Sequence, residues 1–208
     1  MRIVFAALLL AGCAVSPAQA NPALPVGDRG LQSADLVFHE STSRQSAAIR
    51  AATGSRFTHV GLVFVRGGRT WVLEAVGPVK YTRFAAWARR GQDGEVQARR
   101  LRDGARLLTP QSAERLRVEA ERHLGKRYDR LFEWTDRAMY CSELVWKAYA
   151  RALDVRIGEP QRIGDLDLDA PAVRALVASR RARPDPDEPI VTPIAMMESD
   201  ALVAIDLR

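Results

Sequence analysis

The chain has 208 residues, of which 47% are hydrophobic and 27% charged, so it can bury a full core and is not predominantly disordered. The formal charge of +6 comes largely from arginines that are scattered along the sequence, a pattern that indicates a solvated surface. The length favours one domain.

Residues 1–20 have the parts of a secretory signal peptide. Arg2 gives a positive end, residues 3–12 form an apolar run, and Ala18-Gln19-Ala20 resembles a cleavage site. The run is shorter than the roughly 20 apolar residues that cross a bilayer. We therefore predict a signal peptide at residues 1–20 and a single mature domain at residues 21–208.

A second processing route stays open, because Leu10-Ala11-Gly12-Cys13 resembles a lipobox. Cleavage before Cys13 would leave a lipid on that cysteine, and this lipid would be the only attachment to a membrane. Both routes place the protein in the cell envelope, either in the periplasm or anchored at Cys13. Export also argues against a nucleic-acid partner.

The first half of the chain predicts strands at residues 35–38, 58–65 and 70–76, with a helix from Gln45 to Thr53 ended by Gly54. The second half predicts a helix from Thr109-Pro110 to Leu124 and another that begins near Cys141. A proline-rich exposed loop at residues 183–189 precedes a last strand near residues 201–205. Because strands and helices segregate along the chain, we predict an α+β fold with an antiparallel sheet.

The second and third strands predict a geometry that can be tested. Two glycines, Gly67-Gly68, form a tight hairpin turn that would pair Val63 with Val72. In that register His59 and Glu74 are diagonal neighbours on one face, close enough for the carboxylate to orient the imidazole. A polar pair on a solvated sheet face is the alternative, and a one-residue slip would separate the two side chains.

Cys141 is the only cysteine of the predicted mature domain, so it has no partner for an intramolecular disulfide. It lies at the start of an amphipathic helix, where unpaired amides and the macrodipole favour a thiolate. The same amides could stabilise an oxyanion during acyl transfer. A buried, inert cysteine is the alternative.

The remaining histidines are weaker candidates. His39 follows the first strand, where a surface loop position is expected and a position lining the site is the alternative. His123 is expected to be structural in the last turn of a helix. Three scattered histidines without paired cysteines predict no metal site and no cofactor. The sequence also lacks the Gly-x-Ser-x-Gly motif of serine hydrolases.

Several segments of the chain form a joint pattern. They are Asp35-Leu36-Val37-Phe38, Gln45-Ser46-Ala47-Ala48-Ile49, Thr58-His59-Val60-Gly61, Val72-Leu73-Glu74-Ala75, Tyr140-Cys141-Ser142-Glu143-Leu144-Val145 and the stretch from Thr192-Pro193 to Ile205. Together these segments resemble the YiiX/YebB-like branch of the NlpC/P60 superfamily. One departure is Ala34-Asp35, where the family commonly has Gly-Asp.

The resemblance implies a circularly permuted papain-like fold of the NlpC/P60 type, in which the histidine strand precedes the cysteine helix. It implies Cys141 as nucleophile, His59 as base and Glu74 as the residue that orients the base. It also suggests Tyr128 and Tyr140, and we add Ser142, as substrate-binding residues.

The function that follows is a cysteine hydrolase that cleaves a peptide or N-acyl amide through a thioester. Expected substrates are small peptides, cell-wall fragments or acyl lipids. Two alternatives stay open. One is a lipid-directed acyl hydrolase or acyltransferase, and the other is a non-catalytic envelope protein that binds ligands in a papain-like groove.

Overall fold

A computed structural model describes residues 24–180 and 182–207, and the predicted signal peptide and Cys13 lie outside the described residues. Its main feature is a six-stranded sheet in the order β4-β3-β2-β1-β5-β8, in which every neighbouring pair is antiparallel. The strands are β1 (Leu36–His39), β2 (His59–Arg66), β3 (Arg69–Ala75), β4 (Val79–Arg83), β5 (Gln97–Leu101) and β8 (Leu202–Ile205). A second, two-stranded sheet pairs β6 (Gln161–Arg162) with β7 (Pro189–Ile190).

Helices connect and cover these strands. They are α1 (Arg44–Thr53), α2 (Phe84–Ala88), α3 (Gly104–Leu107), α4 (Pro110–Glu121), α5 (Cys141–Leu153), α6 (Pro171–Arg180) and α7 (Pro193–Met197), with short 3-10 turns at η1 (Asp28–Gly30), η2 (Gln92–Gly94) and η3 (Ile163–Asp165). The α+β class and the antiparallel sheet packed against helices are confirmed. Within the described residues, no helix is both long enough and apolar enough to span a bilayer.

The β2–β3 hairpin has the predicted register. Val63 pairs with Val72, and Gly67 and Gly68 both have positive φ values in the turn between the strands. Two consecutive left-handed residues are what a tight hairpin turn requires. This register fixes which side chains of β2 and β3 share a face.

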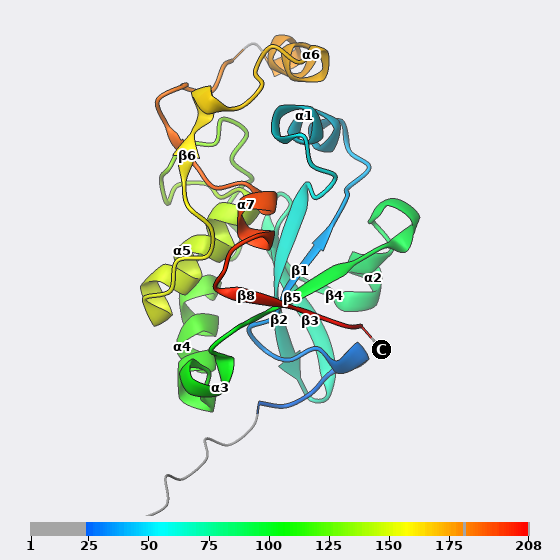
Figure 1. Ribbon diagram of the computed structural model, residues 1–208, viewed down its shortest axis with the longest axis vertical. Helices are drawn as coiled ribbons and strands as arrows, with labels where there is room; N and C mark the ends of the chain where they lie inside the picture. The colour runs from blue at the N-terminus through cyan, green and yellow to red at the C-terminus, as the bar shows by residue number, and fades with distance from the viewer. Residues whose placement is uncertain (1–23, 181, 208) are drawn as a thin grey trace, which may run out of the picture.

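The sheet is covered on both faces (Figure 1). On one face α5 packs on β2 and β3, and α4 lies beside α5. The other face has a smaller core in which Val63 and Val72 pack with Trp87 of α2. His59 and Glu74 are therefore both buried, at 8% and 0% exposure, and the expectation that their face could be solvated is wrong.

Two more helices lie beyond one end of the sheet, with α1 nearer to the strands and α6 outside it (Figure 1). α1 and α6 pack against each other there through Ala48 and Val173 (Figure 1). α1 begins at the N-cap Ser43, whose side chain accepts a hydrogen bond from the Ser46 amide, and it ends at Gly54 with a φ of 65°. The helix α6 was not predicted from the sequence.

The departure at Ala34 has a visible conformational consequence. Its φ is 74°, in the left-handed region that disfavours side chains other than glycine. The turn before β1 thus keeps a conformation suited to glycine, and Ala34 accommodates it while completely buried.

Candidate active site

Cys141 is the first residue of α5, and its position is fixed by the helix start. Tyr140 is the N-cap in an extended conformation, and its backbone N–H donates to Glu143 Oε2 at 3.3 Å. The next hydroxyl, Ser142 Oγ, donates to the carbonyl of Val191 at 2.7 Å. These contacts hold the first turn of α5 against the segment that follows β7.

The surroundings of the thiol favour its ionised form. Burial raises the pKa of Cys141, but the hydrogen bond and charge of His59 and the backbone N–H groups of Val60 and Ser142 outweigh this, so the pKa is lowered. A helix N-terminus acts in the same direction. Cys141 thus has the electrostatic environment of a reactive cysteine rather than of an inert one.

His59 lies between the thiol and a carboxylate. Its Nε2 is 2.7 Å from Glu74 Oε2, which leaves Nδ1 as the ring nitrogen for Cys141. Burial lowers the pKa of His59, but hydrogen bonds to Cys141 and Glu74 and their negative charges raise it to about 9. The structure therefore brings together Cys141, His59 and Glu74, three residues that are far apart in the sequence.

Glu74 has two further partners that the sequence did not reveal. Thr82 Oγ1 donates to Oε1 at 2.6 Å, and Arg90 Nη2 donates to Oε2 at 2.6 Å. Burial raises the pKa of Glu74, but His59, Arg90 and Thr82 lower it to about 2. The carboxylate is consequently ionised and held from three sides.

The other predicted site residues lie around Cys141. The hydroxyl of Tyr128 interacts with the Cys141 thiol, and burial together with that sulfur holds the pKa of Tyr128 well above its usual value. Tyr140 and Ser142 are buried beside the cysteine. The Tyr140 hydroxyl accepts a hydrogen bond from the Val191 N–H at 3.4 Å, so both residues also anchor the backbone.

One expectation about the other histidines is wrong. His39 is not on a surface loop; it ends β1, is 2% exposed and stacks on Trp87 with ring centroids 4.1 Å apart. His123 lies just beyond the end of α4, where it is buried, and burial lowers its pKa to about 4. Packing of Trp87, which is distant in the sequence, buries the His39 ring.

Two cavities of different character meet at the site. A narrow apolar one of about 80 Å³ contains Cys141 in its wall, and a polar one of about 880 Å³ contains His59 and Tyr128. Ile49 and Arg130 line both cavities. The two cavities therefore place a small apolar space beside Cys141 and a larger polar space beside His59.

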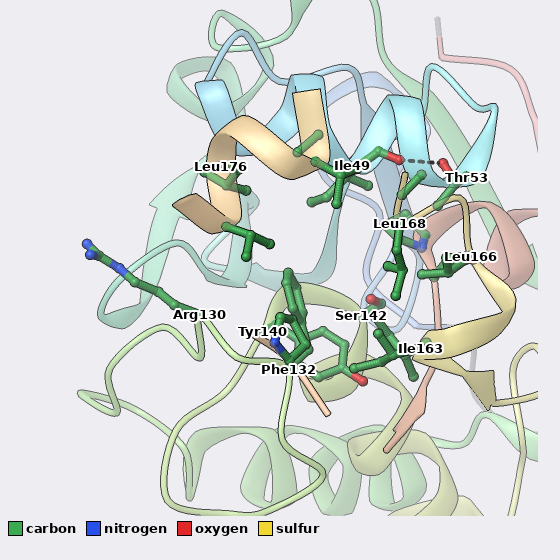
Figure 2. Close-up of a pocket in the computed structure, with 18 of the residues that line it drawn as sticks. Ile49, Thr53, Arg130, Phe132, Tyr140, Ser142, Ile163, Leu166, Leu168 and Leu176 are labelled. Carbon is green, nitrogen blue, oxygen red and sulfur yellow. Dashed lines mark hydrogen bonds between the residues drawn. The ribbon is translucent and has the colours of Figure 1, made fainter. Parts of the chain in front are cut away.

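The apolar cavity is formed by segments that the sequence separates widely (Figure 2). Ile49 of α1, Leu176 of α6 and Leu168 from the segment before α6 face it, with Tyr140 and Ser142 along another wall. The side chain of Arg130 extends away from the apolar residues. A substrate group held here would be apolar and would lie beside the Cys141 sulfur.

A cysteine at a helix start, paired with a histidine on a strand that comes earlier in the sequence, defines a permuted papain-like cysteine hydrolase. The match to a known family agrees with this class. A protein-family model described as "Permuted papain-like amidase enzyme, YaeF/YiiX, C92 family" matches residues 30–206, and the chain belongs to this family. The predicted resemblance and the permuted papain-like fold are confirmed.

Relatives support the same assignment. The chain is 39% identical over 175 residues to the YiiX protein of Escherichia coli strain K12, and the match covers 84% of this chain and 85% of that protein. A crystal structure described as that of metalloprotein yiiX from Escherichia coli O157:H7 is similar with a TM-score of 0.79 and 39% identity, covering 85% of this chain and 97% of that one.

Proposed function

We propose that the protein is a cysteine amidase in which Cys141 attacks the substrate carbonyl, His59 transfers protons and Glu74 orients His59. The observation that carries the proposal is the 2.7 Å contact between His59 Nε2 and Glu74 Oε2. It leaves Nδ1 of the same ring for the thiol at the start of α5. Membership in a family of papain-like amidases supports the reaction class.

In the proposed reaction, the Cys141 proton resides on His59 Nδ1 and the thiolate attacks the amide carbonyl. The tetrahedral intermediate collapses as His59 gives its proton to the leaving amine, and a thioester forms on Cys141. A water molecule then loses a proton to His59 and attacks the thioester. The carboxylic acid leaves, and the thiolate and the imidazolium are restored.

Two features supply charge stabilisation in this scheme. Amides in the first turn of α5 have no helical acceptor and favour negative charge on the sulfur and on the oxyanion. The Tyr128 hydroxyl stays protonated, because burial and the neighbouring sulfur raise its pKa, and it can donate a hydrogen bond to the oxyanion. This gives Tyr128 a role in binding the reacting carbonyl.

The two cavities support a substrate class. The acyl part of the substrate lies on the cysteine side, where the cavity is lined by apolar side chains such as Ile163 and Leu168. The amine part lies on the His59 side, in the larger polar cavity. Among amide substrates, this arrangement favours an N-acyl amide with an apolar acyl group and a polar amine.

The polar cavity also favours a second candidate activity, acyl transfer. It is large enough, at about 880 Å³, to hold an acceptor alcohol or amine beside His59. Such an acceptor would replace water in the second half of the reaction. A lipid ester could enter as the acyl donor through the same apolar cavity.

The description of the related crystal structure as a metalloprotein raises the question of a metal in this chain. Across residues 24–180 and 182–207, no group of three or more His, Cys, Asp or Glu side chains is arranged to hold a metal ion. His59 Nε2 is already engaged by Glu74. The donor set therefore does not fit a metal centre, and the proposed reaction uses none.

We also propose that the protein works in the cell envelope, on the basis of the signal-like residues 1–20. The mass of the mature N-terminus tests this proposal. A chain beginning after Ala20 indicates a soluble periplasmic protein, and a lipid-modified Cys13 indicates a membrane-anchored one. An intact Met1 in the mature protein would contradict both.

The activity itself is tested by trapping the acyl-enzyme. N-acyl amino acids, cell-wall peptides and phospholipids are incubated separately with the wild-type protein and with Cys141→Ala, and mass spectrometry follows the peptide that contains residue 141. We expect an acyl adduct on Cys141 with N-acyl amides, and none on the variant. A protein that binds these ligands without ever forming an adduct would be a non-catalytic binding protein.

A further inference from the structure

His39 is a buried histidine that the proposed reaction does not use, and it lies against the histidine that the reaction does use. The two residues are direct partners in the β1–β2 ladder. Their ring centroids are 5.2 Å apart, with an angle of 29° between the planes. His39 is therefore placed to restrict the orientation of the His59 ring.

Trp87 packs against both histidine rings. Its ring lies 4.1 Å from the His39 ring at 17°, and 6.0 Å from the His59 ring at 28°. Trp87 is completely buried, so the cluster has a rigid wall. The planes of the three rings are close to parallel.

Two glycines show how tightly the cluster is enclosed. A Cβ added to Gly91 would lie 3.0 Å from His39 Cβ, and one added to Gly61 would lie 3.4 Å from Trp87 Nε1. The backbone at Gly91 thus lies close to His39, and the backbone at Gly61 lies close to Trp87, because neither glycine has a side chain.

Burial, more than the charged groups around it, keeps His39 neutral. Burial lowers the pKa of His39 to about 3, the positive charges of His59 and Arg90 act in the same direction, and Glu74 opposes them. His59 is faced in turn by Cys141 and Glu74, and its own pKa is raised to about 9. At neutral pH one ring of the pair is charged and the other is not.

We propose that His39 is a positioning residue that holds the plane of the His59 ring, so that Nε2 faces Glu74 while Nδ1 faces Cys141. The proposal rests on the proposed pairing of Cys141 with His59. It assigns His39 no proton transfer and no contact with substrate.

The physical reason is the combination of stacking and charge. A neutral aromatic ring beside an imidazolium is an attractive contact, whereas a second cation there would repel it. Loss of the flat surface would let the His59 ring rotate, and both hydrogen bonds would weaken together. The thiolate would then lose part of its stabilisation, and the pKa of Cys141 would rise.

The test measures how the rate of alkylation of Cys141 by iodoacetamide depends on pH, in the full chain, with the modified peptide identified by mass spectrometry. This readout needs no substrate. His39→Leu keeps volume but removes the aromatic face, and His39→Phe restores a flat ring without nitrogen atoms. His123→Leu is the matched control, because His123 is another buried histidine whose pKa is also lowered by burial, and it takes no part in the ring cluster.

We expect His39→Leu to raise the midpoint of the alkylation profile by about one pH unit, because a displaced His59 imidazolium stabilises the Cys141 thiolate less. His39→Phe should return the midpoint close to the wild-type value, and His123→Leu should leave it unchanged. Turnover by His39→Leu should fall roughly 10- to 100-fold, because misplaced catalytic groups cost that much. Circular dichroism confirms that each variant is folded.

The proposal is overturned if folded His39→Leu has the wild-type midpoint, or if His39→Phe shifts it as far as His39→Leu does. An equal shift in His123→Leu would also overturn it, since loosening of the fold would then explain the effect. If the wild-type midpoint equals that of a free thiol, Cys141 and His59 do not form the proposed pair. That result would overturn both the proposed pairing and the role of His39. If the alkylation profile shows the pairing but no amide is cleaved, the proposed amidase activity is wrong. The alkylation result for His39 is then still valid.

Discussion

Glu74 Oε2 lies 2.7 Å from His59 Nε2, and the carboxylate has no exposed surface. Arg90 Nη2 donates to both oxygens of Glu74, so positive and negative groups alternate from Arg90 through Glu74 and His59 to the thiolate of Cys141. Charges buried in this order stabilise one another, and removal of one leaves its neighbour unpaired. The first prediction concerns the carboxylate in the middle of this series.

Glu74→Gln should lower kcat/KM by about 10²- to 10⁴-fold, because the amide neither fixes the ring nor stabilises the imidazolium. It should also raise the pH at which Cys141 becomes reactive, since the pKa of His59 falls without the carboxylate. Steady-state kinetics and iodoacetamide alkylation measure the two effects. Glu159→Gln, at an exposed position, is the control, and equal activity in both variants would mean that Glu74 is not needed.

The pH dependence of turnover should be bell-shaped. Activity rises as Cys141 ionises, at a pH below that of an ordinary thiol because its pKa is lowered. Activity falls as the pH passes about 9, the pKa of His59, because the neutral ring cannot protonate the leaving amine. Alkylation of Cys141 needs only the thiolate and should lack the alkaline decline, so a parallel decline in both profiles would contradict the assignment of His59 as the acid.

The sequence predicts best what neighbouring residues determine. The β2–β3 hairpin depends on the Gly67-Gly68 turn and on apolar residues around it, and both are local signals. Its register then places His59 and Glu74 together. The start of α5 at Cys141 was predicted in the same way, from apolar residues at helical spacing.

The partners of Glu74 could not be predicted, because they come from elements without a clear pattern. Thr82 lies in β4 and Arg90 follows α2, two short elements with charged residues nearby. β5 has two adjacent arginines, Arg99 and Arg100, and it is a strand only because it pairs with β1 and β8. Tertiary pairing overrides weak local preference in each case.

The burial of His39 and the apolar cavity depend on contacts between distant parts of the chain. Trp87 buries His39, although the two residues are far apart in the sequence. The apolar cavity needs α6 beside α1, and in a sequence Val173 and Leu176 look like ordinary core residues. Whether such residues fill a core or line a space is decided by the packing of the whole molecule.

Arg90→Gln tests the outer end of the charge series. Arg90 lowers the pKa of Glu74, which is about 2 in the folded protein and 4.5 in an unperturbed residue. The stabilisation from Glu74 is therefore complete above pH 4.5 and is lost as the pH falls towards 2. In Arg90→Gln the pKa of Glu74 should move upward towards 4.5, so the stabilisation from Glu74 should be smaller and its loss should be complete at a higher pH.

The measurement is the free energy of unfolding by urea at several acidic pH values. Arg89→Gln is the matched control. Arg89 is the exposed neighbour of Arg90, and its substitution changes the net charge by the same amount. The difference between the two variants should amount to about 1 kcal/mol or more near neutral pH and shrink in acid. Identical acid profiles would show that Arg90 does not stabilise the carboxylate.

Leu176→Trp tests whether the apolar cavity holds the acyl group. Leu176 faces this cavity from α6, and a larger ring there would occupy the space that a long acyl chain needs (Figure 2). We expect kcat/KM for N-acyl amides to fall by roughly tenfold or more for each methylene that no longer fits, while the shortest acyl groups are cleaved as in the wild type. The same substitution at the exposed Leu124, Leu124→Trp, should not change the preference for chain length. A uniform loss of activity for every chain length in Leu176→Trp would instead show that the cavity supports the fold and does not bind the acyl chain.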